Sequence, residues 1–354
     1  MKKLALIGCG GIGRYHLQHF LQFKDIQLAG FCDLIPERAE SFAAEAGGAA
    51  FTDYREMYDA IRPDMVFIGI PPTAHGEIEL ETIRRRIPFF VEKPVALDLG
   101  LAKKIRDAVS EAGLITAVGF QCRYSNITDV TSDYIRQHEI AMIQCARIGG
   151  VPDVAWWRDK NLSGGQIVEQ TIHQFDLIRA VYGEPVSVCT MGMRGLVKEV
   201  PDYNTDDLSV SVIRFAGGAL GSIATGCYAQ DSASFDSKIT FGSRKSRLDH
   251  YLLQKVDQYG ELPAQNADTS SEGLIFKGDG TLVQSGREQS LTVKDSGGAG
   301  LRCDRTFIDA VLSGDAGKIR SPYADAVKSL AFTLACNQSM ATGQTVDIQA
   351  LLAD

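Results

Sequence analysis

The sequence predicts an α/β protein with an N-terminal doubly wound parallel sheet and a C-terminal α+β domain on a large, mostly antiparallel open sheet. Short apolar runs alternate with helical patterns over the first 120 residues, and a glycine-rich turn follows the first run. After Tyr182, strand patterns follow one another with little helix between them. The length of 354 residues also favours two domains, since one domain usually takes about 100–200 residues.

Five apolar runs of the N-terminal region are typical of buried parallel strands. They are Leu4–Ile7, Gln27–Cys32, Met65–Ile70, Phe89–Val91 and Ile115–Phe120. The helical patterns between them include Ile12–Phe23, Pro36–Glu45 and Leu99–Ala112. Strands and helices that alternate at this spacing form a doubly wound sheet with right-handed crossovers. We place this first domain at residues 1–121.

The second predicted domain, residues 122–354, contains helices and an open sheet. Helical patterns cover Asn126–His138, Gly164–Tyr182, Arg302–Leu312 and Ala324–Thr342, and strand patterns cover Ser187–Gly192, Leu208–Phe215, Leu220–Cys227, Lys238–Phe241 and Arg247–Leu252. The pair Gly217-Gly218 suits a hairpin turn, and residues 257–300 suggest loops with short strands. An open sheet needs a cover on each face, so we expect helices on one face and a partner subunit, in a homodimer or homotetramer, on the other. We also allow for the last helix packing back on the first domain.

Composition and charge exclude several functional classes. The net charge of -8 argues against a nucleic-acid partner, which a basic patch would have to bind. No run approaches the roughly 18 apolar residues of a membrane span, and the short apolar start lacks the cleavage site of a signal peptide. Eight scattered cysteines without a C-x-x-C pair are typical of reduced, buried thiols. We therefore expect a cytoplasmic protein.

The glycine-rich turn has the G-x-G-x-x-G spacing of a dinucleotide site, as in the Rossmann fold. Its residues are Gly8, Cys9, Gly10, Gly11, Ile12 and Gly13. The first glycine permits the tight turn, the second lets the backbone approach a pyrophosphate, and the third lets helix pack closely on strand. The pyrophosphate would lie on unpaired N–H groups at the start of the helix.

Asp33 lies 20 residues after Gly13, at the end of the second predicted strand. A carboxylate there can accept the ribose hydroxyls of the adenosine and would repel a 2′-phosphate, which favours NAD over NADP. Arg38 on the following helix moderates this preference. The alternative is that Asp33 only caps that helix.

Two further motifs complete a family resemblance. They are the run from Asp64 to His75, which contains Pro71, and the tetrapeptide Val91-Glu92-Lys93-Pro94. Together with the glycine turn and the later pattern Gly164-Gly165…Glu169…His173, they resemble the glucose–fructose oxidoreductase/inositol dehydrogenase (Gfo/Idh/MocA) family. The resemblance covers essentially the whole chain.

The resemblance implies an NAD(P)-dependent oxidoreductase that acts on CH–OH groups. In this family Lys93 would touch the reacting hydroxyl, Pro94 would fix the turn, and His173 would transfer the proton. Pro71, His75 and Glu92 would lie beside the cofactor. Glu169 stands where the family usually has Asp.

The spacing of the later residues supports a common site. Gln166, Glu169, His173 and Asp176 recur at steps of three and four residues, which places them on one face of the predicted helix. A histidine has a suitable pKa for a general base, and Glu169 or Asp176 could orient its ring. Lys93 would stabilise the alkoxide that forms as hydride leaves. A solvated helix face is the alternative.

The expected substrate is a cyclic polyol, sugar or sugar derivative. Trp156 and Trp157 could stack on the C–H face of a ring, although structural packing explains either tryptophan equally well. Arg123 and Asp176 are further candidates for substrate binding, and a domain-interface salt bridge is the alternative for Arg123. We expect no metal site, because no histidine pairs with Cys or a carboxylate at ligand spacing. His16 and His19 are interpreted as helix surface or packing near the cofactor.

Three functions remain open on the sequence. The leading one is an NAD-dependent dehydrogenase of a polyol or sugar. A second is an NAD-dependent glycosidase that works by transient oxidation and elimination. A third is a non-catalytic dinucleotide-binding regulator, which the joint presence of Lys93, Glu169 and His173 disfavours.

Overall fold

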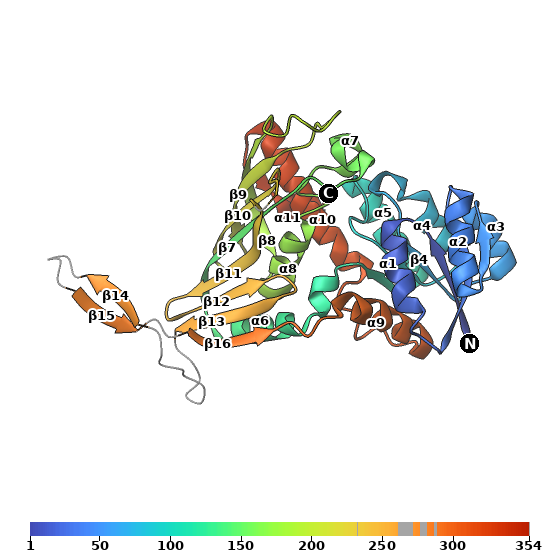
Figure 1. Cartoon of the computed structure of the whole chain (residues 1–354), viewed down its shortest axis with the longest axis horizontal. Coiled ribbons are helices and arrows are strands. Elements are labelled where there is room, and N and C mark those ends of the chain that lie inside the picture. Colours follow the sequence, from blue (N-terminus) through green and yellow to red (C-terminus); the bar gives the residue numbers. More distant parts are fainter. Residues whose placement is uncertain (232, 261–271, 277–281, 287–288, 354) are drawn as a thin grey trace. The chain divides into compact units, whose positions relative to one another are not determined.

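The computed structural model describes residues 1–231, 233–260, 272–276, 282–286 and 289–353, which form two compact units (Figure 1). The first unit comprises Met1–Tyr124, Val154–Ile172 and Gly298–Leu334, and the second comprises the rest of the described chain. Residues 1–121, predicted as the first domain, lie within the first unit. The other two segments of that unit come from the range that the sequence analysis placed in the second domain.

The first unit contains a parallel sheet of the order β3-β2-β1-β4-β5-β6. Its strands are β1 (Lys2–Ile7), β2 (Ile26–Cys32), β3 (Ala49–Phe51), β4 (Met65–Ile68), β5 (Phe89–Val91) and β6 (Thr116–Val118). The sequence analysis missed β3, whose three residues are only partly buried or exposed. Apart from that short edge strand, the predicted runs are the observed strands to within a few residues.

Helices cover both faces of this sheet. They are α1 (Gly11–Phe20), α2 (Pro36–Ala46), α3 (Tyr54–Ile61), α4 (Glu77–Arg84), α5 (Leu99–Ala112), α9 (Ala299–Ser313) and α10 (Tyr323–Thr342). Leu4 and Leu6 of β1 join a core with α1, α2 and α9, whereas Ala5 and Ile7 join a second core with α3, α4, α5 and the start of α10. Alternate residues of one strand therefore point to opposite cores, as a doubly wound sheet requires. The segment Gly298–Leu334, which contains α9, therefore belongs to the doubly wound fold of the first unit.

The second unit is built on a nine-stranded sheet of the order β16-β13-β12-β11-β7-β10-β9-β8-β17. The strands are β7 (Ile140–Gly149), β8 (Pro185–Met193), β9 (Leu208–Phe215), β10 (Leu220–Cys227), β11 (Phe235–Ser243), β12 (Ser246–Tyr251), β13 (Lys255–Gly260), β16 (Gln289–Lys294) and β17 (Val346–Asp347). The β7–β10 pair is parallel, and the other neighbours are antiparallel. A mostly antiparallel open sheet is therefore confirmed. The sequence analysis missed the central strand β7.

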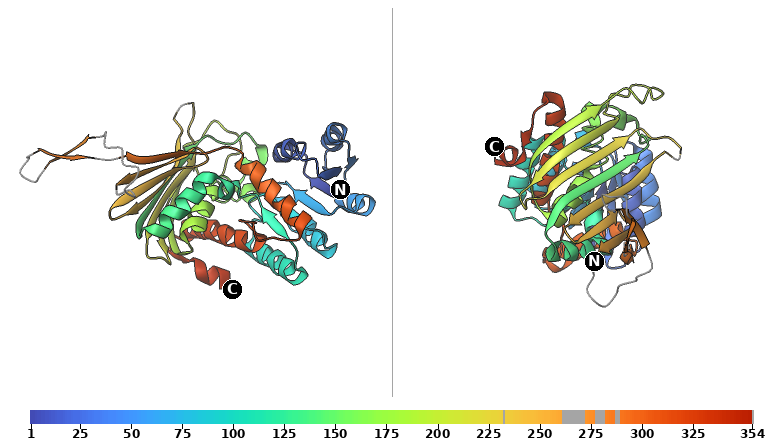
Figure 2. Two further views of the ribbon diagram at one scale, coloured as in Figure 1. Left: turned by 90° about the horizontal axis from the view of Figure 1, so that it is seen from below. Right: turned by 90° about the vertical axis from the view of Figure 1, so that its left-hand side faces the viewer.

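Helices lie along one face of this sheet, and none of the described helices covers the other face, which we call the open face. The helices of the second unit include α6 (Asn126–Gln137), most of α8 (Ile172–Tyr182), the end of α10, and α11 (Ile348–Ala353). The right-hand view of Figure 2 looks onto the open face, where the strands run side by side with no helix in front of them. A separate hairpin pairs β14 (Glu272–Phe276) with β15 (Leu282–Gly286). The predicted loops of 257–300 fall partly outside the described residues.

The predicted single helix Gly164–Tyr182 is wrong. A short helix, α7 (Lys160–Ser163), ends just before Gly164, and α8 begins only at Ile172. Gly164 and Gly165 have φ values of +78° and +87°, in the left-handed region that a right-handed helix cannot pass through. The N–H of Thr171 then bonds to Gln166 O, five residues back. Glu169 and His173 therefore do not share one helix face.

None of the helices in the described part of the chain combines the length and the apolar character that a bilayer crossing needs.

Candidate active site

The motifs of the first unit meet at the carboxyl-terminal edge of its sheet. The N–H of Gly69 donates to Ile7 O over 2.8 Å, and the N–H of Glu92 donates to Ile68 O over 2.9 Å. The residues that follow β1, β4 and β5 are thus held side by side. In doubly wound sheets, ligands bind at this edge where the strand order reverses, which is here between β1 and β4.

The glycine turn, Gly8–Gly13, is shaped by main-chain packing at its two ends and is open in its middle. Gly8 has φ +93°, and a Cβ there would lie 2.1 Å from Gly69 O. A Cβ on Gly13 would lie 2.0 Å from Gly8 O. By contrast, a Cβ on Gly10 or Gly11 would meet no atom within 4 Å. The open space lies where a phosphate has to approach the backbone.

The first turn of α1 supplies the electrostatics of this site. In the described structure no side chain caps the helix at Gly10, and its first turn contains no acidic residue. The unpaired N–H groups and the positive end of the helix dipole are therefore available to an anion. Ile12 is 40% exposed beside the turn. These features fit the pyrophosphate of a dinucleotide.

Asp33 connects the glycine turn to the end of β2. Its Oδ2 accepts a hydrogen bond of 2.8 Å from the N–H of Cys9, and its Oδ1 accepts one of 2.9 Å from the N–H of Ile35. The second bond is the local one that a helix-capping aspartate makes, whereas the first reaches into the turn. Burial and the nearby Asp33 raise the pKa of the Cys9 thiol to about 12, so this thiol stays neutral.

A cavity of about 400 Å³ opens between the glycine turn and α2. It is lined by Cys9, Gly10, Gly11, Arg14, Glu37, Arg38, Ser41 and Phe42. The guanidinium of Arg14 lies 4.2 Å from the centroid of the Phe42 ring. A flat cation over an aromatic ring, next to the ribose-binding position of Asp33, fits the adenosine half of the cofactor.

His75 is held in place by a residue that the sequence analysis missed. Its Nδ1 lies 2.6 Å from Glu79 Oε1, and Glu79 Oε2 accepts a 2.6 Å hydrogen bond from the N–H of Gly76. Glu79 is fully buried, and its carboxylate holds the His75 ring in one orientation. The buried Nε2 of His75 has no hydrogen-bond partner among the described residues. The i, i+4 spacing was a visible signal for this pair.

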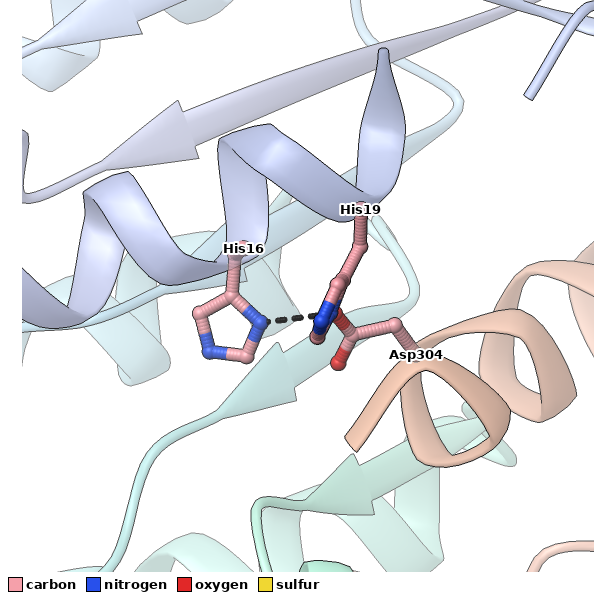
Figure 3. A group of neighbouring side chains, drawn as sticks. All are labelled: His16, His19 and Asp304. Atoms are coloured by element: carbon pink, nitrogen blue, oxygen red, sulfur yellow. Dashed lines mark hydrogen bonds and ion pairs between the residues drawn. The ribbon is translucent and has the colours of Figure 1, made fainter. Parts of the chain in front are cut away.

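The Glu92 side chain is directed to the interior of the first unit. Its Oε1 lies 3.1 Å from His16 Nε2, and only 6% of Glu92 is exposed. His16 in turn lies 2.9 Å from Asp304 on α9 (Figure 3). We therefore reassign the Glu92 carboxylate from a cofactor contact to a support of the turn before Lys93. His16 is 2% exposed, so its interpretation as helix surface is wrong.

Lys93 forms a cluster with two residues of the segment Val154–Ile172. Its Nζ donates to Glu169 Oε1 over 2.9 Å and to Glu169 O over 3.0 Å. Trp157 Nε1 donates to Glu169 Oε2 over 2.6 Å. The peptide bond between Lys93 and Pro94 is cis, which is the unusual geometry of this turn. A lysine ammonium has three donors, so this lysine cluster (Lys93, Glu169 and Trp157) leaves one N–H of Lys93 for another acceptor.

Two predicted substrate contacts have structural partners instead. Trp157 is 1% exposed, so its ring has no open face on which a sugar could stack. We assign its indole N–H the task of orienting Glu169. Arg123 is 5% exposed and donates to Arg320 O over 2.7 Å and to Asp325 Oδ2 over 2.6 Å. This is a salt bridge within the first unit, whereas the alternative interpretation of Arg123 expected one at a domain interface.

His173 and Asp176 belong to the second unit. His173 is the second residue of α8 and is half-buried, and Asp176, one turn later, is 1% exposed. Pro71 is exposed and precedes the short 3-10 turn Pro72–Ala74 that leads to His75. The roles of these residues come from the resemblance and remain predictions.

Comparison with known proteins identifies the family. Residues 2–120 match the family described as "Oxidoreductase family, NAD-binding Rossmann fold", and residues 138–245 match the "GFO/IDH/MocA C-terminal domain". These ranges cover more than half of the chain. The chain belongs to the Gfo/Idh/MocA oxidoreductase family. The resemblance, the fold class and the NAD-type cofactor that the sequence predicts are thereby confirmed.

Relatives of this family include enzymes that act on inositols and sugars. The chain is 26% identical over 252 residues to myo-inositol 2-dehydrogenase of Thermotoga maritima, covering 70% of this chain and 74% of that enzyme. It is 27% identical over 187 residues to glucose-6-phosphate 3-dehydrogenase of Bacillus subtilis, covering 50% of this chain and only about half, 53%, of that enzyme. Its fold matches levoglucosan dehydrogenase in complex with NADH with a TM-score of 0.80 and 18% identity, over 98% of this chain and 99% of that one.

Proposed function

We propose that the protein is an NAD-dependent dehydrogenase that moves hydride between the nicotinamide and a hydroxyl or keto carbon of a cyclic polyol, sugar or sugar derivative. The observation that carries this proposal is the position of Lys93 Nζ. It is fixed 2.9 Å from Glu169 Oε1, directly after β5, at the sheet edge where the dinucleotide turn also ends. A positioned ammonium with one available donor suits a substrate oxygen that becomes negative.

Lys93 would act on the substrate oxygen. When a secondary alcohol is oxidised, hydride leaves the carbon and the proton leaves the oxygen. Bound NAD accepts the hydride. The ammonium of Lys93 would donate a hydrogen bond to the oxygen and stabilise its negative charge as the C–H bond breaks. Glu169 and Trp157 would keep the ammonium in one orientation.

His173 is our candidate for the base that takes the hydroxyl proton. The support is the family resemblance, the suitable chemistry of imidazole near neutral pH, and the continuity of the chain. His173 follows Glu169 by four residues, so their Cα atoms lie within about 14 Å of each other however the chain runs. Asp176, one turn further along α8, is the candidate partner of the imidazole or of the substrate.

We propose NAD rather than NADP as the preferred cofactor. The support is the Asp33 carboxylate, which is held by two main-chain N–H groups at the end of β2. A negative charge there accepts ribose hydroxyls and repels a 2′-phosphate. Arg14 and Arg38 line the same cavity, so the preference should be measurable but not absolute.

The test is NADH formation at 340 nm with NAD and a panel of inositols, hexoses, hexose phosphates and anhydrosugars. Sustained NADH formation that is lost in both Lys93→Ala and His173→Ala would support the dehydrogenase. Cleavage of a glycoside without net NADH formation would instead establish an NAD-dependent glycosidase. NAD binding with neither reaction across the panel would favour a regulator and count against the proposal.

We also propose that the open face of the nine-stranded sheet forms a homo-oligomer interface. An apolar patch on this face consists of Met142, Met191, Val210, Val212 and Leu220, each between 44% and 78% exposed. Strand pairing places Val210 opposite Met191, and Leu220 opposite Met142. Val212 lies between these two pairs along β9, opposite Ser222 of β10 and Cys189 of β8. Large exposed apolar patches mark interfaces.

Light scattering after size exclusion tests this interface. We expect Val212→Lys to shift the protein to a smaller species, because a charge would be buried against the partner. Val154→Lys is the matched control, since Val154 is also exposed, at 40%, but lies outside the patch. A monomeric wild type, or an unchanged mass for Val212→Lys, would contradict the proposed interface.

The cysteines support a cytoplasmic location. The structure contains eight free cysteines, of which Cys189 is exposed and the others are buried. Free thiols persist in a reducing compartment. Cell fractionation with a reducing-compartment marker tests this, and recovery in an oxidising compartment would overturn it.

A further inference from the structure

A group of potential metal ligands lies between α1 and α9 and shares no residue with the lysine cluster. His16 Nδ1 is 2.9 Å and His19 Nδ1 is 2.7 Å from the same oxygen, Asp304 Oδ2 (Figure 3). The three ligand atoms all lie within 4.8 Å of one another. The histidines are one turn apart on α1, and the aspartate comes from a helix 285 residues later. The site therefore exists only in the folded chain.

We propose that His16, His19 and Asp304 bind one divalent transition-metal ion, with zinc as the ion that best fits two imidazoles and one carboxylate. Zinc accepts such ligands at about 2.0–2.2 Å in a tetrahedral site whose fourth position a water can fill. Tetrahedral ligands lie about 3.4 Å apart at these bond lengths. The two imidazole nitrogens lie 2.9 Å and 2.7 Å from Asp304 Oδ2, so each of these two separations would have to lengthen by about half an ångström or slightly more on binding.

The surroundings of His16 match those of a metal-bound histidine. With Nδ1 directed to the metal position, its other nitrogen, Nε2, lies 3.1 Å from Glu92 Oε1. Histidines that bind metals almost always donate their second N–H to a carboxylate or a carbonyl, which fixes the tautomer. Glu92 is 6% exposed and His16 is 2% exposed, so this pair is shielded from water.

The charge of the cluster also favours a divalent cation. Asp304 and Glu92 place two carboxylates in a buried region, and two neutral histidines with one divalent ion would balance them.

A protonated His16 is the competing arrangement. In that arrangement His16 donates from Nδ1 to Asp304 and from Nε2 to Glu92, and a proton takes the place of the ion. A metal ion would replace the Nδ1 proton and join α1, α9 and the turn before Lys93 through one centre.

The experiment measures metal directly and does not depend on catalysis. Full-length, tag-free protein is prepared with zinc, dialysed and analysed for metal per chain by mass spectrometry. Chelator-treated protein is then titrated with Co²⁺ and the visible absorption is recorded. We expect one equivalent of zinc per chain, and an intense tetrahedral Co²⁺ spectrum that saturates at one equivalent.

His19→Gln is the decisive variant, because His19 has a side chain that is 13% exposed and tolerates replacement better than the buried His16 or Asp304. We expect His19→Gln to lose bound zinc and the tetrahedral Co²⁺ spectrum, and Glu92→Gln to weaken Co²⁺ binding about 10- to 100-fold. His138→Gln is the matched control. Like His19, His138 lies at the C-terminal end of a helix, but its Nδ1 donates to a main-chain oxygen, Tyr134 O.

A second readout keeps the test valid if a variant is less stable. Added zinc should raise the Tm of the chelator-treated wild type and of His138→Gln, but not that of His19→Gln. Wild type without bound zinc and without a tetrahedral Co²⁺ spectrum would overturn the proposal. So would a spectrum that His19→Gln leaves unchanged. NAD binding, measured separately by fluorescence, distinguishes this result from failure of the proposed dehydrogenase.

Discussion

The glycine turn and the lysine cluster lie at the same edge of one sheet, but main-chain groups form the first and side chains form the second. The glycine turn offers main-chain N–H groups. Gly10 and Gly11 in its middle leave open space beside the backbone because they have no side chains. The lysine cluster depends on side chains from segments 64 and 76 residues further along the chain, Trp157 and Glu169, which hold one ammonium. The comparison indicates that six contiguous residues can shape the turn proposed for the pyrophosphate, whereas fixing the Lys93 ammonium requires distant parts of the chain.

The largest effect should follow from removing the ammonium of the lysine cluster. Lys93→Ala should lower kcat about 10²- to 10³-fold, the effect of losing one donor to a developing oxyanion. The Kd for NAD should change little, because the glycine turn is intact. Lys104→Ala, at an exposed position of α5, is the control. Steady-state kinetics and NAD titration make the measurement, and a change confined to NAD affinity would place Lys93 in cofactor binding instead.

The next largest effect should come from adding one methyl group to the glycine turn. Gly13→Ala places a Cβ 2.0 Å from Gly8 O, so the backbone must shift at a cost of about 1–3 kcal/mol. That cost corresponds to about a 5- to 150-fold weaker Kd for NAD if it falls on the binding conformation. Gly11→Ala adds the same methyl where no atom lies within 4 Å. Equal effects of the two substitutions on NAD binding would show that backbone packing does not shape the turn.

The sequence predicted those features that short, contiguous patterns encode. Hydrophobic periodicity located β1, β2, β4 and β5, and the glycine spacing located the start of α1. Each of these depends on local geometry that a few neighbouring residues determine. The role of Lys93 comes from the family resemblance of its tetrapeptide and stays a prediction.

The sequence could not predict those features that depend on tertiary contacts. Two left-handed glycines, Gly164 and Gly165, break the helix that periodicity predicted through Glu169 and His173. Burial of Trp157 turns an expected substrate contact into a support for Glu169. Asp304, on the distant helix α9, completes a cluster with His16 and His19. The spacing of the two histidines in the sequence gave no sign of this contact.

A smaller effect should follow from removing one hydrogen bond of the lysine cluster, the bond from Trp157 to Glu169, while the Lys93 ammonium is kept. Trp157→Phe keeps most of the buried ring but deletes the N–H that donates to Glu169 Oε2. A hydrogen bond to a charged group contributes about 1.5–3 kcal/mol, and Lys93 still holds the other oxygen, so we expect about a tenfold loss of kcat. Trp156→Phe, at the half-buried neighbour, is the control. Stopped-flow measurement of hydride transfer should show the loss, and an unchanged rate would mean that Lys93 alone orients Glu169.

The smallest effect should be a change in the preference for NAD over NADP when Asp33 is substituted, because the Asp33 side chain reaches into the glycine turn. Asp33→Asn removes the negative charge but keeps an oxygen that can accept from the N–H of Cys9. We expect the preference for NAD over NADP to fall about fivefold, the equivalent of about 1 kcal/mol. Asp53→Asn is a matched control, because Asp53 also follows a strand and accepts from the N–H two residues later, that of Arg55. The ratio of kcat/KM for the two cofactors is the measurement. If both substitutions change that ratio equally, Asp33 acts as a helix cap, and the selectivity must come from Arg14 and Arg38 in the adjoining cavity.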